Sequence, residues 1–96
     1  MEWVKESKRY IDFIEKQKGY SPLTMKSYLS TFEEASSFIH VETQGEEIFF
    51  DASFYRLSLA HQGKRTIARK MSALRSLVAF WRSEGKKVRA KGVESM

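Results

Sequence analysis

The sequence predicts an all-α fold, a compact domain of four helices at about residues 2–18, 21–40, 51–61 and 64–84. Two observations predict it. Apolar residues recur at helical spacing in the first, second and fourth of these segments, and glycine or a serine-proline pair stands at their boundaries. At 96 residues the chain is long enough for one core and too short for a second, and its thirteen aromatic residues supply bulk for that core.

The first helix is predicted over residues 2–18. Trp3, Tyr10 and Ile14 share one face, a spacing typical of residues that pack into a core. Gly19 is placed to end this helix, because glycine adopts the left-handed conformation that other residues resist.

Ser21 and Pro22 predict the start of the second helix. Serine accepts a hydrogen bond from a free amide of the first turn, and proline lacks an N–H that would have had no partner there. The early part of the exposed face of this helix carries hydroxyls and a lysine but no acid: Thr24, Lys26, Ser27 and Thr31. These side chains are predicted to contact phosphate, because the helix dipole favours an anion there, whereas Ser21 is predicted to be only a cap.

The middle of the chain is predicted to hold a loop and a short third helix. Residues 40–47 are polar and lack apolar periodicity, so we interpret them as a loop. A strand over residues 47–50 is conceivable from its apolar character, but a single strand has no partner with which to form a sheet. Asp51 is predicted to cap the third helix, with Phe54 and Leu57 pointing inward.

The fourth helix, residues 64–84, is the segment that points to a function. One face is an apolar stripe predicted to be buried: Ile67, Met71, Leu74, Val78 and Trp81. The opposite face alternates arginine with small residues: Arg65, Arg69, Ser72, Ser76 and Ser83, with Ala79 at its edge. Longer cations border the apolar stripe: Lys64, Lys70, Arg75 and Arg82. The small side chains leave room for an anionic partner between the arginines, and we interpret this helix as one that contacts DNA.

Charge is divided unevenly along the chain. Residues 1–63 hold seven basic and ten acidic side chains, a net charge of −3, whereas residues 64–96 hold ten basic and two acidic ones, a net charge of +8. This asymmetry indicates an anionic partner, with nucleic acid the first candidate and an acidic membrane surface the second. Residues 86–96 are basic and unpatterned, so we interpret them as a linker or flexible tail.

Several kinds of chemistry are not indicated by the sequence. There is no cysteine, which excludes disulfides and fits a reducing interior, and no apolar run is long enough for a membrane span or a secretory signal. His40 and His61 have no second metal ligand at a suitable spacing, and no nucleophile or phosphate-loop motif occurs. We therefore expect a cytoplasmic protein without cofactor, metal or small-molecule substrate, which is not itself an enzyme.

Two stretches, in this order and at this separation, resemble a known family. Residues 21–24 read SPLT, with Tyr28 four positions on, and residues 66–67 (TI) lead into SALRS at 72–76. Together they resemble the N-terminal core-binding domain of tyrosine recombinases, the phage integrase and Xer group, over roughly residues 3–85.

The resemblance implies a SAM-like fold that clamps one face of a DNA half-site with its second and fourth helices, while a separate domain cuts the strand. Residues 86–96 would lead toward that catalytic domain, which is absent from this chain. Arg75 lies nearest the apolar stripe, and pairing with an acid of a neighbouring helix is the alternative for it. The positions that match the family's DNA contacts are Thr24, Lys26, Ser27, Lys64, Arg65, Thr66, Arg69, Ser72 and Arg75.

The family's catalytic residues are implied to lie in the absent domain, since neither His40 nor His61 has an arginine three positions later. The chain also lacks the Asn-Pro that the family's linker often carries. We therefore expect a non-catalytic DNA-binding domain of a recombinase that cuts and rejoins DNA, with double-stranded DNA and other recombinase subunits as partners. The DNA site, and whether the parent is a phage integrase, a chromosome-dimer resolvase or an integron-type enzyme, stay open.

Two other functions compete with this one. A SAM-like protein interaction module would use the basic helix to dock on an acidic partner, or on residues 42–47 of a second copy. A stand-alone helix-turn-helix regulator would use the short third helix and the basic fourth helix, joined by Gln62 and Gly63, but it leaves residues 1–39 without a role.

Overall fold

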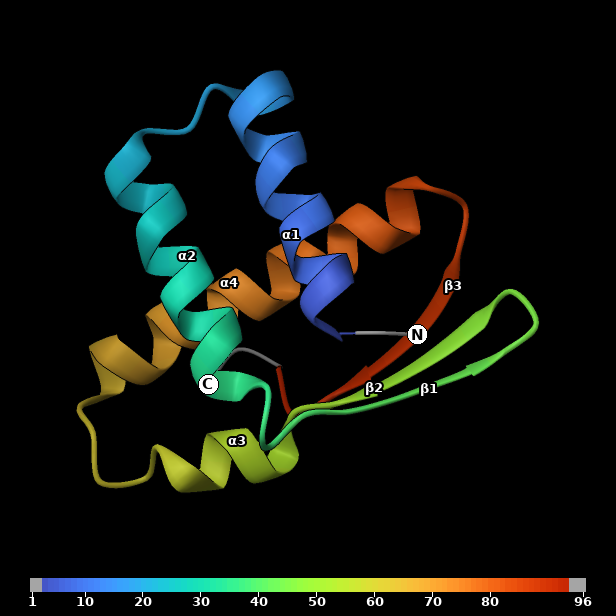
Figure 1. Ribbon diagram of the computed structural model, residues 1–96. Helices are drawn as coiled ribbons and strands as arrows, with labels where there is room; N and C mark the ends of the chain where they lie inside the picture. The colour runs from blue at the N-terminus through green and yellow to red at the C-terminus, as the bar shows by residue number, and fades with distance from the viewer. Residues whose placement is uncertain (1–2, 94–96) are drawn as a thin grey trace.

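The computed structural model describes residues 3–93 and combines a helical body with a small sheet (Figure 1). In chain order the elements are α1 (Trp3–Phe13), the π-helical turn η1 (Ile14–Lys18), α2 (Pro22–Ala35), β1 (His40–Gln44), β2 (Glu47–Asp51), α3 (Ser53–Ser58), α4 (Lys64–Ser83) and β3 (Lys87–Lys91). The four predicted helices are therefore confirmed, but the second ends at Ala35 and not at residue 40, and the third spans Ser53–Ser58 and not 51–61. The all-α class is wrong because of the three strands. Residue 2 of the predicted first helix and residues 94–96 of the predicted tail lie outside the described residues.

The three long helices form the body of the domain. Helices α1 and α2 run antiparallel, and α4 crosses behind both of them (Figure 1). Gly19 ends η1 in the left-handed conformation, at a φ of 62°, as predicted. The Ser21 hydroxyl accepts the Thr24 amide at 3.2 Å, so the predicted cap of α2 is also confirmed.

The core lies between these helices and the inner face of the sheet. All five residues of the predicted apolar stripe on α4 are buried: Ile67, Met71, Leu74, Val78 and Trp81. Trp81 is fully buried and packs edge-on against Phe50 of β2, with the ring centroids 5.8 Å apart. Phe50 in turn stacks on Trp3 of α1 at 5.9 Å, which ties the sheet to the first helix. This packing holds α4 rigidly in place.

The predicted loop at residues 40–47 is wrong, because it forms strand β1 and the turn of a hairpin. Strand β1 pairs antiparallel with β2, and Gly45 makes the turn at a φ of 62°. Only one side of β1 faces the core, where Val41 lies opposite Phe50, and the rest of the strand is polar. The sequence pattern was therefore too weak to indicate a strand.

The tail predicted at residues 86–96 is wrong for residues 87–91, which form strand β3. This strand pairs in parallel with β2, so the sheet has the order β1-β2-β3. Val88 is buried opposite Ile48, and Ala90 lies opposite Phe50. The strand forms because β2 offers a partner that is about 40 residues away in the sequence, a long-range pairing that local pattern cannot reveal. Whether a catalytic domain follows stays a prediction.

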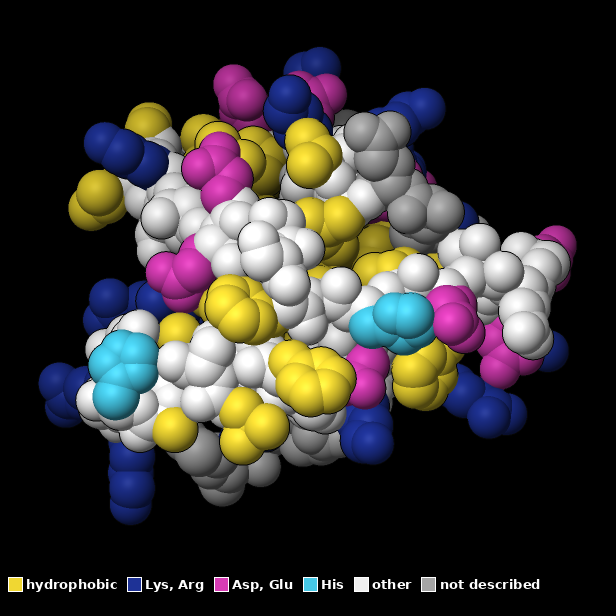
Figure 2. All heavy atoms as spheres, turned by 60° about the horizontal axis from the view of Figure 1, so that its bottom comes forward, with side chains coloured by type: hydrophobic (Ala, Val, Ile, Leu, Met, Phe, Trp, Pro, Cys, Tyr) yellow, Lys and Arg dark blue, Asp and Glu magenta, His cyan; other side chains and the backbone are white. Residues whose placement is uncertain are grey.

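The face of α3 that packs inward differs from the predicted one. Phe54 and Leu57, expected to point inward, are 66% and 69% exposed, whereas Tyr55 and Leu59 are buried. Asp51 lies in β2 and not in the helix, yet its carboxylate accepts the Ser53 amide at 2.8 Å. The face that carries α3 shows apolar side chains at the surface (Figure 2).

Candidate nucleic-acid interface

The outward side of α4 is a row of arginines and small residues. We call this row the outward stripe; it consists of Arg65, Ala68, Arg69, Ser72, Ser76, Ala79 and Ser83. Arg65 and Arg69 are exposed, as are Ala68 and Ala79. Because the opposite side of the helix is packed into the core, the stripe is a preformed surface with its cations at the end nearest the helix N-terminus.

Among the described residues, the two arginines of the outward stripe have no ion-pair partner. Within residues 3–93, neither Arg65 nor Arg69 lies within salt-bridge distance of a carboxylate, and the same holds for Lys64 at the start of the helix. Lys70, by contrast, pairs with Glu34 of α2 at 2.8 Å. The arginines therefore face solvent with their charge uncompensated by the described chain.

The two arginines that border the buried stripe of α4 bind the chain itself. Arg75 donates to the carbonyl of Val93 at 2.7 Å, and Arg82 donates to the carbonyl of Val88 at 3.0 Å. Both bonds hold the segment that contains β3 against α4. Arg75 was one of the predicted DNA contacts, and the structure gives it an internal partner on the backbone, not an acid of a neighbouring helix.

The first turns of α2 supply the second part of the predicted interface. Lys26 is exposed, and Thr24 and Ser27 are half-buried. The prediction that Thr31 is exposed on this face is wrong, because Thr31 is buried and donates to the carbonyl of Ser27 at 3.1 Å. The Thr24 hydroxyl lies 2.9 Å from the hydroxyl of Ser21, so Thr24 belongs to the helix cap as well as to the predicted contact set. Thr66 and Ser72 of α4 are half-buried too. Of the nine predicted residues, the exposed ones are Lys26, Lys64, Arg65 and Arg69.

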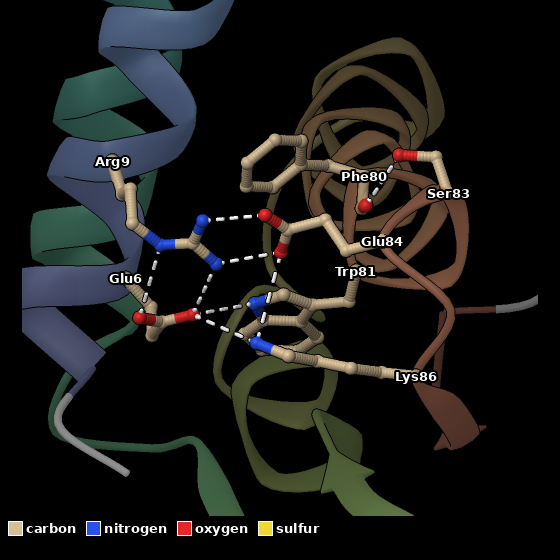
Figure 3. Close-up of polar contacts among 7 residues, drawn as sticks. All are labelled: Glu6, Arg9, Phe80, Trp81, Ser83, Glu84 and Lys86. Atoms are coloured by element: carbon tan, nitrogen blue, oxygen red, sulfur yellow. Dashed lines mark hydrogen bonds and ion pairs between the residues drawn. The ribbon is translucent and has the colours of Figure 1, made fainter. Parts of the chain in front are cut away.

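An ionic network fixes α1 to the C-terminal end of α4 (Figure 3). Arg9 binds both oxygens of Glu84 at 2.6 Å and contacts Glu6 at 3.0 Å. Glu6 also accepts the indole N–H of the buried Trp81 at 2.9 Å, and Lys86 lies 3.9 Å from it. Sequence reasoning missed this network, because Glu6 and Glu84 have the pattern of ordinary surface acids.

The network shifts the ionisation of its members. Burial raises the pKa of Glu6, but hydrogen bonds from Arg9 and Trp81 outweigh burial, so the pKa lies below its ordinary value. The hydrogen bond from Arg9 lowers the pKa of Glu84, and the bonds to Glu84 and Glu6 raise the pKa of Arg9. All three groups are therefore charged at neutral pH, and they clamp α1 onto α4.

Other kinds of site are not found in the part of the chain that the structure describes. No group of three or more histidine, cysteine or acidic side chains is placed to hold a metal ion within residues 3–93. His40 pairs locally with Glu42 at 2.9 Å, and His61 is exposed. None of the helices in this range has the length and apolar character needed to cross a membrane.

The helical body of this chain matches a known protein family. The chain matches the family described as "Phage integrase, N-terminal SAM-like domain" over residues 7–85, and it belongs to that family. The resemblance predicted from the motifs of α2 and α4 is therefore confirmed. The match ends before β3, so the strand that completes the sheet lies outside the matched region.

The chain is similar to curated proteins named Tyrosine recombinase XerC. It is 36% identical over 78 residues to the protein of Bacillus licheniformis, and the aligned region covers 74% of this chain and 25% of the relative. It is 35% identical over 77 residues to that of Thermodesulfovibrio yellowstonii, covering 79% of this chain and 26% of the relative. The chain thus spans about a quarter of the length of these relatives. No solved structure matches the chain significantly.

Proposed function

We propose that this chain is the non-catalytic DNA-binding part of a longer tyrosine recombinase, and that it clamps a DNA half-site. Its membership of the integrase family and its similarity to proteins named as recombinases support the recombinase assignment. The cutting and rejoining of strands, and the contacts with other subunits on DNA, would belong to the longer protein.

One observation carries the proposal for the DNA-binding surface. Arg65 and Arg69 are exposed on a helix whose other side is locked into the core, and no carboxylate of residues 3–93 compensates them. Arginine in such a position can donate to the phosphate oxygens of duplex DNA without first breaking an internal bond. In the proposed interface, Lys64 of α4 and Lys26 of α2 add exposed positive charge, and Thr24, Ser27, Thr66 and Ser72 supply hydroxyls.

The test is the salt dependence of binding to a fluorescein-labelled duplex, measured by anisotropy. If about four phosphates are contacted, log K should fall against log salt with a slope of roughly −3.6. A slope near zero, or no binding at about 50 mM salt, would contradict the proposal.

The role of the outward stripe is tested by Arg69→Ala. We expect an affinity loss of about tenfold on any duplex, since a charge-assisted contact to phosphate is removed. Arg89→Ala is the matched control, because Arg89 is an exposed arginine that pairs with Glu47 on the sheet at 2.9 Å. Equal losses in the two variants would mean that net charge, and not this surface, governs binding.

A second candidate, a protein interaction module, rests on a different observation. Phe54 and Leu57 of α3 are 66% and 69% exposed, and apolar side chains lie at the surface of that face (Figure 2). Sedimentation at low salt without DNA distinguishes the two candidates. Self-association that duplex DNA does not alter would favour the interaction module.

A further inference from the structure

A hollow lies between the end of the first helix and the outward stripe. Its volume is about 250 Å³, and its far wall includes Ser76 and Ser83, two members of the stripe. The near wall comes from α1, η1 and the turn that follows, and includes Tyr10, Lys18 and Tyr20. The hollow therefore shares Ser76 and Ser83 with the outward stripe. Neither Lys18 nor Tyr20 was among the predicted contacts.

The backbone places Lys18 at the edge of this hollow. Residues 14–18 form a π-helical turn, and Gly19 then reverses the chain with a φ of 62°. Such turns are rare and occur often at functional positions. The ring of Tyr20, the next residue, packs edge-on against Tyr28 of α2 with centroids 6.1 Å apart. Lys18 and Tyr20 are thus presented from a turn that both neighbouring helices support.

The supply of hydrogen-bond donors decides what the hollow can bind. The Ser76 hydroxyl donates to the carbonyl of Ser72 at 3.0 Å, and the Ser83 hydroxyl donates to the carbonyl of Phe80 at 2.6 Å. Tyr10 is buried, and burial raises its pKa to about 12. The two serine hydroxyls are therefore engaged with backbone carbonyls, and Tyr10 lies in the buried wall of the hollow.

Lys18 and Tyr20 are exposed donors at the rim of this hollow. Within residues 3–93, no carboxylate lies at ion-pair distance from the Lys18 ammonium, and the Tyr20 hydroxyl has no hydrogen-bond partner. Lys16, on the same turn, differs, since it pairs with Asp12 at 3.2 Å. A ligand that only accepts hydrogen bonds and carries negative charge fits this donor set, and a phosphodiester is such a ligand.

We propose that Lys18 and Tyr20 bind one phosphate of the DNA backbone at this hollow. The interface would then extend from α2 and α4 to the turn between the first two helices. The inference rests on the proposed function, because the phosphate belongs to the same duplex that the outward stripe binds. The apolar part of the hollow, which includes Phe80, lies where the sugar next to that phosphate would pack.

The test compares two lysines of one turn, using the 96-residue chain and the labelled duplex. Lys18→Ala should weaken binding by about tenfold and make the salt slope shallower by about 0.9, the contribution of one phosphate. Tyr20→Phe, which removes only the hydroxyl, should weaken binding by about threefold. Lys16→Ala removes the same charge from the same turn and should change affinity by less than about twofold, because its ammonium is already paired.

The outcomes separate this inference from the proposed function. Equal losses in Lys18→Ala and Lys16→Ala would overturn the inference, since net charge alone would explain them. Unchanged binding by Lys18→Ala, together with a loss in Arg69→Ala, would overturn it and leave the proposed function standing. If the parent chain does not bind duplex at low salt, both this inference and the proposed function are contradicted. Circular dichroism of each variant checks that the fold is intact, which is expected because Lys18 is exposed.

Discussion

Two sets of arginines on the same domain differ in whether the chain itself binds them. Arg65 and Arg69 are exposed, and no carboxylate within residues 3–93 pairs with them. Arg9, Arg75 and Arg82 are bound to the chain itself, through Glu84 or through backbone carbonyls. The two sets are alike in residue type. The difference teaches that a count of cations does not show which of them are available to an outside partner, because the folded chain already binds some of them.

The largest expected effect is a loss of stability when the contact of Glu6 with Arg9 and Trp81 is removed. Glu6→Ala should lower the free energy of unfolding by about 2–3 kcal/mol, because the buried indole N–H of Trp81 loses its acceptor and Arg9 loses one of its two carboxylates. Urea denaturation measures this loss. Asp12→Ala, which breaks the exposed pair with Lys16 on the same helix, is the control and should cost less than about 0.5 kcal/mol.

A smaller loss of stability is expected from Arg75→Ala. Removing the bond to the Val93 carbonyl should cost about 1–2 kcal/mol, while the affinity of the folded protein for duplex stays within about twofold. Arg69→Ala should do the opposite, with a loss of affinity and little change in stability. If Arg75→Ala weakens DNA binding as much as Arg69→Ala and leaves stability unchanged, the distinction between the two sets is lost.

The smallest expected effect is the loss of stability at low pH. Hydrogen bonds from Lys70 and Tyr55 lower the pKa of Glu34, and the pKa values of Glu6 and Glu84 are lowered as well, each from an ordinary value of 4.5. A carboxyl whose pKa is lower in the folded state adds stability above its unfolded pKa and loses it as the pH falls through the folded pKa. Stability should therefore be level from pH 7 to about 5 and fall below it.

The acid effect is small because Glu34 and Glu84 are partly exposed and screened by solvent. Thermal unfolding at a series of pH values measures it. Glu6→Gln keeps an acceptor for Trp81 but cannot titrate, so its profile should fall less steeply than that of the parent. A parent profile that stays level to pH 3 would show that these carboxylates do not contribute.

Local pattern predicted the helices and their ends. The Ser21 cap, the left-handed Gly19 and the buried stripe that ends at Trp81 are each specified by residues within a few positions of one another. The motifs of α2 and α4 also predicted the family correctly. Local pattern did not predict β1 and β3, because each strand has few inward residues and forms only against β2.

What the sequence by itself determined is the helical framework and the solvent-facing position of Arg65 and Arg69, since helical periodicity places them opposite the apolar stripe. What only the tertiary structure decided is which cations are already occupied. Arg75 and Arg82 bind carbonyls of the C-terminal segment that packs back onto α4, and Arg9 binds an acid 75 residues away. The physical reason is that such partners come together only when the chain folds, and no spacing in the sequence records their distance.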